Sequence, residues 1–274
     1  MSVEYHLYRI KFIKPAQIPL FLSEITPAEI FMKALNEKPS YEVNEGLIWH
    51  IGNLQFSSEN FGKFAIGRTT KTTVEKYDDH LKNFKEVDDD RSPYTYVLFD
   101  ISLGLIGIAT KNTLASTSKA ISNKIKDTLS KSNIVSDYEV DVRVDHVPNP
   151  VNFIERLKKA FVVKKFKATF TGPNPVDADE LFQKPLSVYC NEMKAENGSI
   201  EVSGESLDSN VVQLVAKATA ATGNSASARI KESEFGDVIT IRLKAEPVRL
   251  FIDDNTEIEE AVKLLRSHYA EVRT

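Results

Sequence analysis

Hydrophobic and polar side chains alternate with a period of two in many parts of the chain, which predicts β-strands with one buried and one exposed face. The clearest case lies in residues 161–175, where Phe166, Ala168 and Phe170 alternate with lysine and threonine. Pro173 ends this run, because proline lacks the N–H group that a sheet needs. Similar runs predict further strands at residues 5–13, 47–56, 61–73, 94–101, 105–109, 138–146, 200–202, 226–231 and 238–245.

Helical spacing of apolar residues predicts helices between these strands. The first begins at Thr26, whose hydroxyl can cap the helix while Glu29 completes a capping box, and it ends before Pro39. Other helices are expected near residues 114–130, 151–157, 185–196, 208–222 and 256–269.

The order of these segments predicts an α+β fold, because the strands often follow one another in pairs instead of alternating strictly with helices. We expect two lobes of mixed or antiparallel sheet with helices packed on one face, and the two lobes either have separate sheets or share one. The N-terminal lobe covers residues 1–149 and the C-terminal lobe covers residues 150–274. Residues 76–93 are highly charged and lack apolar periodicity, which predicts a solvated loop.

The tetrapeptide Pro-Asn-Pro-Val occurs at residues 148–151 and again at residues 173–176, each time between a predicted strand and a predicted helix. Proline ends a strand and suits a helix start, so Asn149 and Asn174 are expected to be extended and to cap the following helices. A pair of helix N-termini at one sheet edge could also attract anions. The structural role is favoured, because Asp177 and Asp179 already occupy the first turn of the second helix.

Composition narrows the class of protein. The chain has 274 residues, a formal net charge of −4 and a single cysteine, Cys190. One cysteine excludes an internal disulfide and a zinc site built from several cysteines. No stretch approaches the roughly 18 continuous apolar residues of a membrane span. These features predict a cytoplasmic protein without a membrane partner.

Basic residues recur in pairs, two positions apart, on the polar sides of three predicted strands. If these strands share a sheet, the pairs form a basic stripe that can follow a phosphate backbone. The candidate nucleic-acid-binding residues are Arg9, Lys11, Lys165, Lys167, Arg242 and Lys244. A solvated sheet face with intervening acids is the alternative interpretation.

Acidic residues gather near the two Pro-Asn-Pro-Val segments, and oxygen ligands are those that Mg²⁺ prefers. The candidate residues for this alternative are Asp141, Asp145, Asp177 and Asp179, with His146 and Glu180 beside them. They would make the chain a metal-dependent nuclease or toxin. The only Glu-x-Lys sequence, at Glu192, falls on a predicted helix, which is the wrong context for such a nuclease. The chain also lacks phosphate-binding glycine loops and the common hydrolase motifs.

The segments GLIGIATKNTL at residues 104–114 and FKATFTGPNPVDADELF at residues 166–182 resemble uncharacterised bacterial proteins from mobile elements and phage-defence islands. The resemblance implies a context and assigns no catalytic residue. Our leading hypothesis is therefore a non-enzymatic binding or regulatory protein that needs no cofactor. We expect a protein partner, and a nucleic-acid partner is the further possibility that the basic stripe raises.

Overall fold

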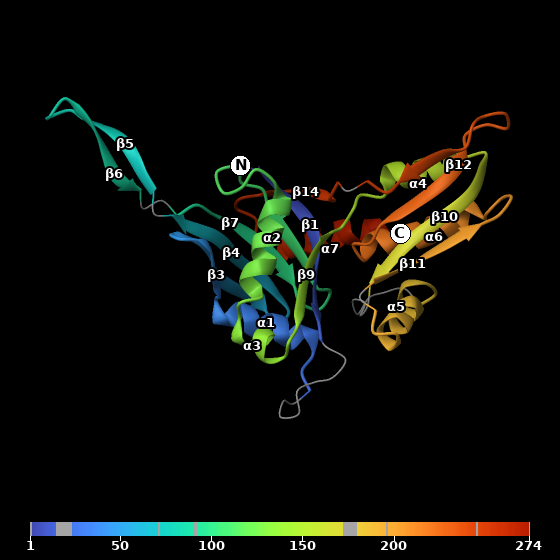
Figure 1. Cartoon of the computed structure of the whole chain (residues 1–274), viewed down its shortest axis with the longest axis horizontal. Coiled ribbons are helices and arrows are strands. Elements are labelled where there is room, and N and C mark those ends of the chain that lie inside the picture. The colour runs from blue at the N-terminus through green and yellow to red at the C-terminus, as the bar shows by residue number, and fades with distance from the viewer. Residues whose placement is uncertain are drawn as a thin grey trace.

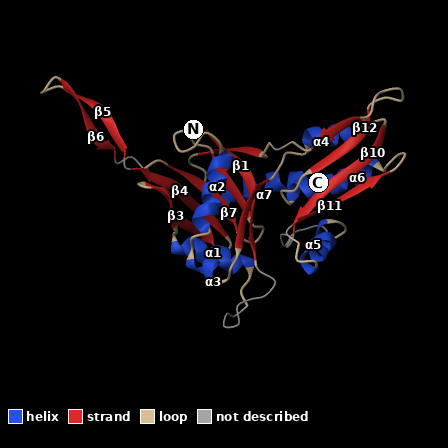
Figure 2. Cartoon of the chain, viewed as in Figure 1, coloured by secondary structure: helices blue, strands red, loops and turns tan. Residues whose placement is uncertain are grey.

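The structure of the chain is a computed structural model that describes residues 2–14, 24–70, 72–89, 92–171, 180–195, 197–244 and 246–273. Two separate antiparallel sheets and one projecting hairpin make up its β-structure (Figure 1). Helices and strands are both abundant and interspersed (Figure 2). The α+β fold with antiparallel sheets is thus confirmed.

The first sheet has eight strands, in the order β14-β1-β8-β7-β4-β3-β2, and β9 also pairs with β1. All its pairs are antiparallel. Its strands are β1 (Ser2–Ile13), β2 (Ser40–Asn44), β3 (Leu47–Ser58), β4 (Phe61–Thr70), β7 (Tyr94–Asp100), β8 (Leu105–Ala109), β9 (Asp141–His146) and β14 (Arg249–Asp253).

One face of this sheet packs against α1 (Pro27–Glu37), α2 (Ser118–Leu129) and α3 (Asn133–Asp137). The α1 helix begins with the capping box predicted from its sequence, because Thr26 Oγ1 accepts from the N–H of Glu29 and the Glu29 carboxylate accepts from the N–H of Thr26. Aromatic rings fill the centre of this core. The ring centre of Phe31 lies 5.2 Å from that of Phe12 and 6.0 Å from that of Phe99.

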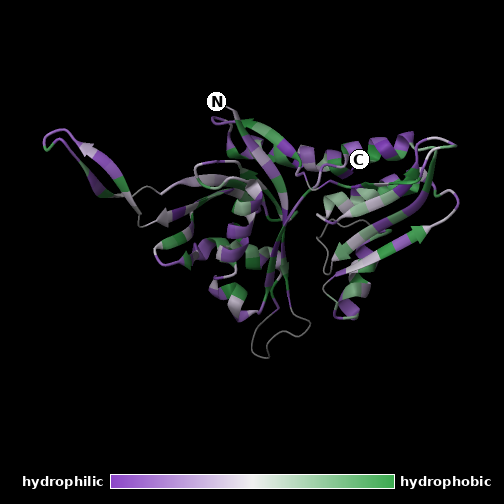
Figure 3. Ribbon diagram, turned by 45° about the horizontal axis from the view of Figure 1, so that its top comes forward, coloured by the Kyte–Doolittle hydropathy of each residue, from purple (hydrophilic) through white to green (hydrophobic). Residues whose placement is uncertain are grey.

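The second sheet has four strands in the order β11-β10-β12-β13, all antiparallel. They are β10 (Val162–Thr171), β11 (Asn197–Ser203), β12 (Ala226–Lys231) and β13 (Ile239–Arg242). Helices α4 (Val151–Lys159) and α6 (Ser209–Ala221) pack on one face, and α5 (Gln183–Glu192) lies beside β10. Hydrophobic and hydrophilic residues interleave along the strands of both sheets, as alternation requires (Figure 3).

The last helix, α7 (Ile258–Arg273), lies between the two sheets. Its Val262 and Leu265 belong to one continuous core with Leu98 and Leu105 of the first sheet and with the buried face of the second. The first sheet therefore carries helices on both faces, unlike the one-sided packing expected from the sequence.

The chain crosses from the first sheet to the second near Asn149, where the sequence predicted a division. It then returns, because β14 pairs with β1 and α7 packs against the first sheet. The last residues of the predicted C-terminal lobe thus complete the N-terminal one, and the two lobes do not share a sheet.

Residues 76–93 differ from the predicted solvated loop. Most of them form a hairpin of β5 (Thr72–Asp78) and β6 (Asn83–Asp89), which stands clear of both sheets in Figure 1. The apolar pairs Val74–Val87 and Tyr77–Phe84 lie on opposite sides of the hairpin, so neither side shows the apolar alternation by which a strand is recognised. The expected exposure is correct, since no side chain described between residues 73 and 87 is buried.

The first Pro-Asn-Pro-Val segment behaves as a strand-to-helix turn. Asn149 Oδ1 accepts a hydrogen bond of 3.0 Å from the N–H of Val151, the first residue of α4. The N-cap position itself is Pro150, so Asn149 lies one residue earlier than the cap expected from the sequence. The second segment, with Asn174, lies outside the described residues. None of the helices described is long and apolar enough to cross a bilayer.

Candidate nucleic-acid interface

The open face of the second sheet carries the basic residues of β10, β12 and β13. Lys167 lies opposite Ser227, which in turn lies opposite Arg242, so these side chains form one row across three strands. In the next row Lys165 lies opposite Arg229. Directly paired residues point to the same side of a sheet. The four cations therefore share a face, which we call the basic face.

Packing explains why this face is open. Residues that alternate with the cations, such as Ala168, Ala228 and Ile241, are buried in the core under α4 and α6. Lys167, Arg229 and Arg242 are exposed, whereas Lys165 is partly covered. A sheet with helices on one side leaves its other side to water, and the side chains there are mostly polar.

One carboxylate lies within the basic face. Glu201 is the partner of Lys167 in the strand register, but its Oε1 accepts a hydrogen bond from Nζ of Lys165 at 2.6 Å. This bond lowers the pKa of Glu201 below its usual value. Lys165 is thus engaged within the protein, and Lys167, Arg229 and Arg242 are the exposed cations of the face.

Sequence reasoning placed Lys165, Lys167 and Arg242 correctly on one face but missed Arg229. The signal was present, because Ala226, Ala228 and Ile230 alternate with polar residues along β12. Arg229 therefore had to lie on the polar side of a strand, like the predicted pairs.

Lys244 lies just beyond β13 and is exposed. Together with Arg156 of α4, it lines a pocket of about 90 Å³ whose apolar lining is Phe153 and Ile241. We call this the α4–β13 pocket. Its remaining lining residues are Asn149, Asn152, Arg242 and Glu246.

Arg9 and Lys11 are not part of the basic face, which corrects the prediction for these two residues. Both are buried in the first sheet. The guanidinium of Arg9 donates to the Tyr269 hydroxyl at 2.9 Å and lies 5.2 Å from the centre of its ring. The alternation of β1 is real, but α7 and the second sheet cover the side that the sequence marks as polar.

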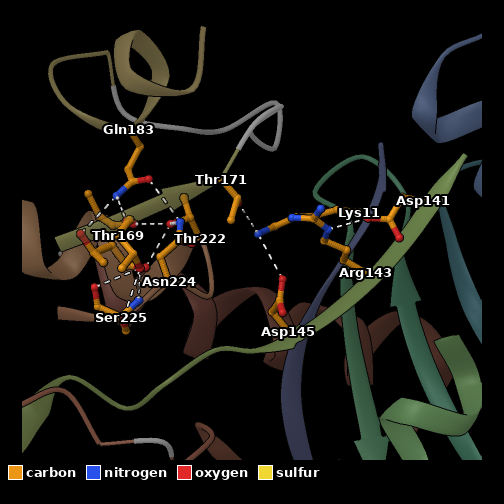
Figure 4. Close-up of polar contacts among 12 residues, drawn as sticks. Lys11, Asp141, Arg143, Asp145, Thr169, Thr171, Gln183, Thr222, Asn224 and Ser225 are labelled. Atoms are coloured by element: carbon orange, nitrogen blue, oxygen red, sulfur yellow. Dashed lines mark hydrogen bonds and ion pairs between the residues drawn. The ribbon is translucent and has the colours of Figure 1, made fainter. Parts of the chain in front are cut away.

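Lys11 connects the two sheets. Its Nζ donates to Asp145 Oδ2 of β9 and to Thr171 Oγ1 of β10, each at 3.3 Å (Figure 4). Burial lowers the pKa of Lys11, and the nearby Asp145 carboxylate opposes that effect. The role of this lysine is structural, since no phosphate could approach a cation so enclosed.

The acids predicted to bind Mg²⁺, which we call the acidic edge, lie only partly within the residues that the structure describes. Asp141 and Asp145 lie on the same strand, and each contacts a cation: Asp141 accepts from Arg143 Nε at 2.7 Å, and Asp145 accepts from Lys11. Glu180 pairs with Lys184 at 2.6 Å. Asp177 and Asp179 lie outside the described residues. Among the residues with described positions, no cluster of three or more acidic, histidine or cysteine side chains could hold a metal ion.

His146, beside this edge, is half-buried at the end of β9. Burial lowers its pKa, and Lys119 adds to the effect. A neutral imidazole is the form that its surroundings favour.

A second polar network lies to the left of Thr171 in Figure 4. The buried Gln183 amide donates to Thr219 Oγ1 at 3.1 Å and accepts from Asn224 Nδ2 at 3.3 Å. These bonds satisfy an amide that would be costly to bury alone, and they hold the start of α5 against the end of α6. This network is therefore structural.

A search against protein-family models found no match to this chain, and a search among curated proteins likewise found none.

Proposed function

We propose that this chain is a non-enzymatic binding protein that takes the phosphate backbone of a nucleic acid on its basic face. The observation that carries the proposal is that Lys167, Arg229 and Arg242 are exposed together on the uncovered side of one sheet. Cations on a rigid sheet keep their spacing, so a polyanion can neutralise several of them at once.

The chemistry of the basic face favours contacts to phosphate over readout of bases. Apart from Glu201, the neighbouring side chains on this face are small and polar, among them Ser199, Ser203, Ser227 and Thr240. Bases in single strands are usually recognised by stacking on aromatic rings, and sequence is read through base edges. Binding should therefore depend strongly on salt and weakly on sequence.

Fluorescence anisotropy with labelled DNA and RNA tests the proposal. The variant Lys167→Glu/Arg242→Glu should bind at least about tenfold more weakly, and the slope of log K against log salt should fall by about 2. The matched control, Lys33→Glu/Lys119→Glu, reverses the same number of exposed cations on α1 and α2 and should bind like the wild type. Equal losses in both variants would show that only net charge matters, which would contradict a defined site.

The same assay, repeated with Mg²⁺, separates this proposal from the nuclease hypothesis. A binding protein leaves the labelled nucleic acid intact. Cleavage that needs Mg²⁺ and is lost in Asp141→Ala would favour an enzyme instead.

The biological context that we propose is bacterial phage defence, in line with the resemblance of residues 104–114 and 166–182 to proteins of defence islands. Cross-linking and sequencing of the bound nucleic acid in cells, before and after infection, tests this context. A bound population that does not change on infection would argue against it.

A further inference from the structure

The β5–β6 hairpin has an unusual distribution of side chains for an element without a core. Tyr77 and Phe84 face each other with their ring centres 5.2 Å apart, and they are 50% and 79% exposed. Leu81 at the tip is 69% exposed. Large apolar side chains grouped on one projecting element are typical of interaction sites.

Charges of equal sign lie opposite each other beside these rings. Glu75 is the direct partner of Glu86, on the same side of the hairpin as Tyr77 and Phe84. Like charges in this arrangement destabilise a strand pair. The hairpin also has six acidic and three basic residues between positions 72 and 89, a formal charge of −3. A basic surface with an apolar centre would relieve both the repulsion and the exposure.

The α4–β13 pocket is a surface of this kind on the same chain. Phe153 and Ile241, which are 4% and 3% exposed, form its apolar floor. Arg156, Arg242 and Lys244 surround them together with the acid Glu246, and Arg156 also contacts Glu232 at 2.7 Å. The pocket thus carries a net positive charge, opposite to the net charge of −3 on the hairpin. Opposite charges around an apolar contact give both orientation and specificity to an interface.

The hairpin cannot reach the pocket of its own molecule. It projects from one end of the long axis, whereas α4 and β12, the neighbour of β13, lie at the other end (Figure 1). We infer that the hairpin of one copy docks, by the side that carries Tyr77 and Phe84, on the α4–β13 pocket of a second copy. The contact is head-to-tail, so a pair of copies still has one free hairpin and one free pocket, and assembly continues into a ring or a filament.

Sedimentation velocity of the full chain, without nucleic acid, tests this assembly. The wild type should form species larger than a dimer as its concentration rises about a hundredfold, and salt should weaken them. The hairpin variant Glu75→Lys/Glu86→Lys and the pocket variant Arg156→Glu/Lys244→Glu should each stay monomeric. Circular dichroism checks that both remain folded.

Mixing the two variants is the decisive step. The hairpin variant keeps an intact pocket and the pocket variant keeps an intact hairpin, so the mixture should form a one-to-one dimer that does not grow further. The matched control, Glu192→Lys/Glu271→Lys, reverses two exposed acids outside the hairpin and should assemble like the wild type. A wild type that is monomeric throughout, a mixture that stays monomeric, or a control that fails to assemble would each overturn the inference. Because the measurement is made without nucleic acid, these outcomes are independent of nucleic-acid binding by the basic face, although Arg242 belongs to both the face and the pocket.

Discussion

Lys11 shows how burial gives a charged residue a structural role. Its ammonium group contacts Asp145 and Thr171 on two different strands, so it links the first sheet to the second. Loss of hydration disfavours the charged form, and that cost exceeds the attraction of Asp145, because the pKa of Lys11 is lowered overall. Forming this link therefore requires the removal of water from a cation, which is unfavourable.

Because the pKa of Lys11 is lowered, the free energy of unfolding depends on pH in the range below about 10.5. The unfolded chain holds this proton up to about pH 10.5, whereas the folded protein releases it at a lower pH. Between these two values the unfolded state binds more protons, so the contribution of Lys11 to the free energy of unfolding rises with pH. In Lys11→Met this contribution is absent.

Urea unfolding of wild type and Lys11→Met at a series of pH values up to 10.5 measures the effect. The free energy of unfolding of the wild type, minus that of the variant, should increase with pH. Tyrosines with raised pKa, such as Tyr5 and Tyr8, affect both proteins equally and cancel in the difference. A difference that is constant or decreases would show that Lys11 keeps its proton in the folded state.

At the scale of the element, the β5–β6 hairpin forms from local interactions alone. Asp78 Oδ1 accepts from the N–H groups of His80 and Leu81, and Asp78 Oδ2 accepts from Lys85 at 2.6 Å. The pKa of Asp78 is lowered, mainly by the bond from Lys85. A two-stranded hairpin without a packed face is only marginally stable in water. Its presence therefore adds little to the stability of the protein.

Replacing residues 72–89 with a short Gly/Ser linker should change the free energy of unfolding by no more than about 0.5 kcal/mol, as for surface changes. The linker closes easily, because β4 and β7 are already adjacent, with Gly67 opposite Tyr94. Chemical unfolding measures the change, and sedimentation should show the variant as a monomer. A large loss of stability would mean that the hairpin packs against the body.

At the scale of the whole molecule, the two sheets are joined by one core. Leu7 and Leu105 of the first sheet, α7, and Ala216 and Ala228 of the second lobe belong to the same hydrophobic cluster. Unfolding one lobe would expose apolar surface of the other at a cost of about 25 cal/mol per Å². The molecule should therefore unfold as a unit.

The single tryptophan, Trp49, makes this prediction measurable. Trp49 is buried in the core between the first sheet and α1 to α3, so its fluorescence reports the first lobe only. Far-ultraviolet circular dichroism reports both lobes. The two urea transitions should coincide, as two-state unfolding requires. Separate midpoints would show that the lobes unfold independently.

The sequence by itself determined most local structure. The capping box at Thr26, the strand containing Phe166 and Phe170, and the turn at Asn149 depend on neighbours within a few residues, and these were predicted correctly. The hairpin at residues 72–89 was missed, because its apolar pairs lie on opposite sides and neither side shows the alternation that marks a half-buried strand.

Only the tertiary structure decided which polar faces meet water. Arg9 and Lys11 have the same spacing in sequence as Lys165 and Lys167, yet the first pair is buried and the second lies on the open basic face. Alternation shows that a strand has two faces, but whether the polar one is covered depends on segments far away in the chain. Here α7, at the end of the sequence, returns to cover β1, while the outer side of β10 has no such cover among the described residues.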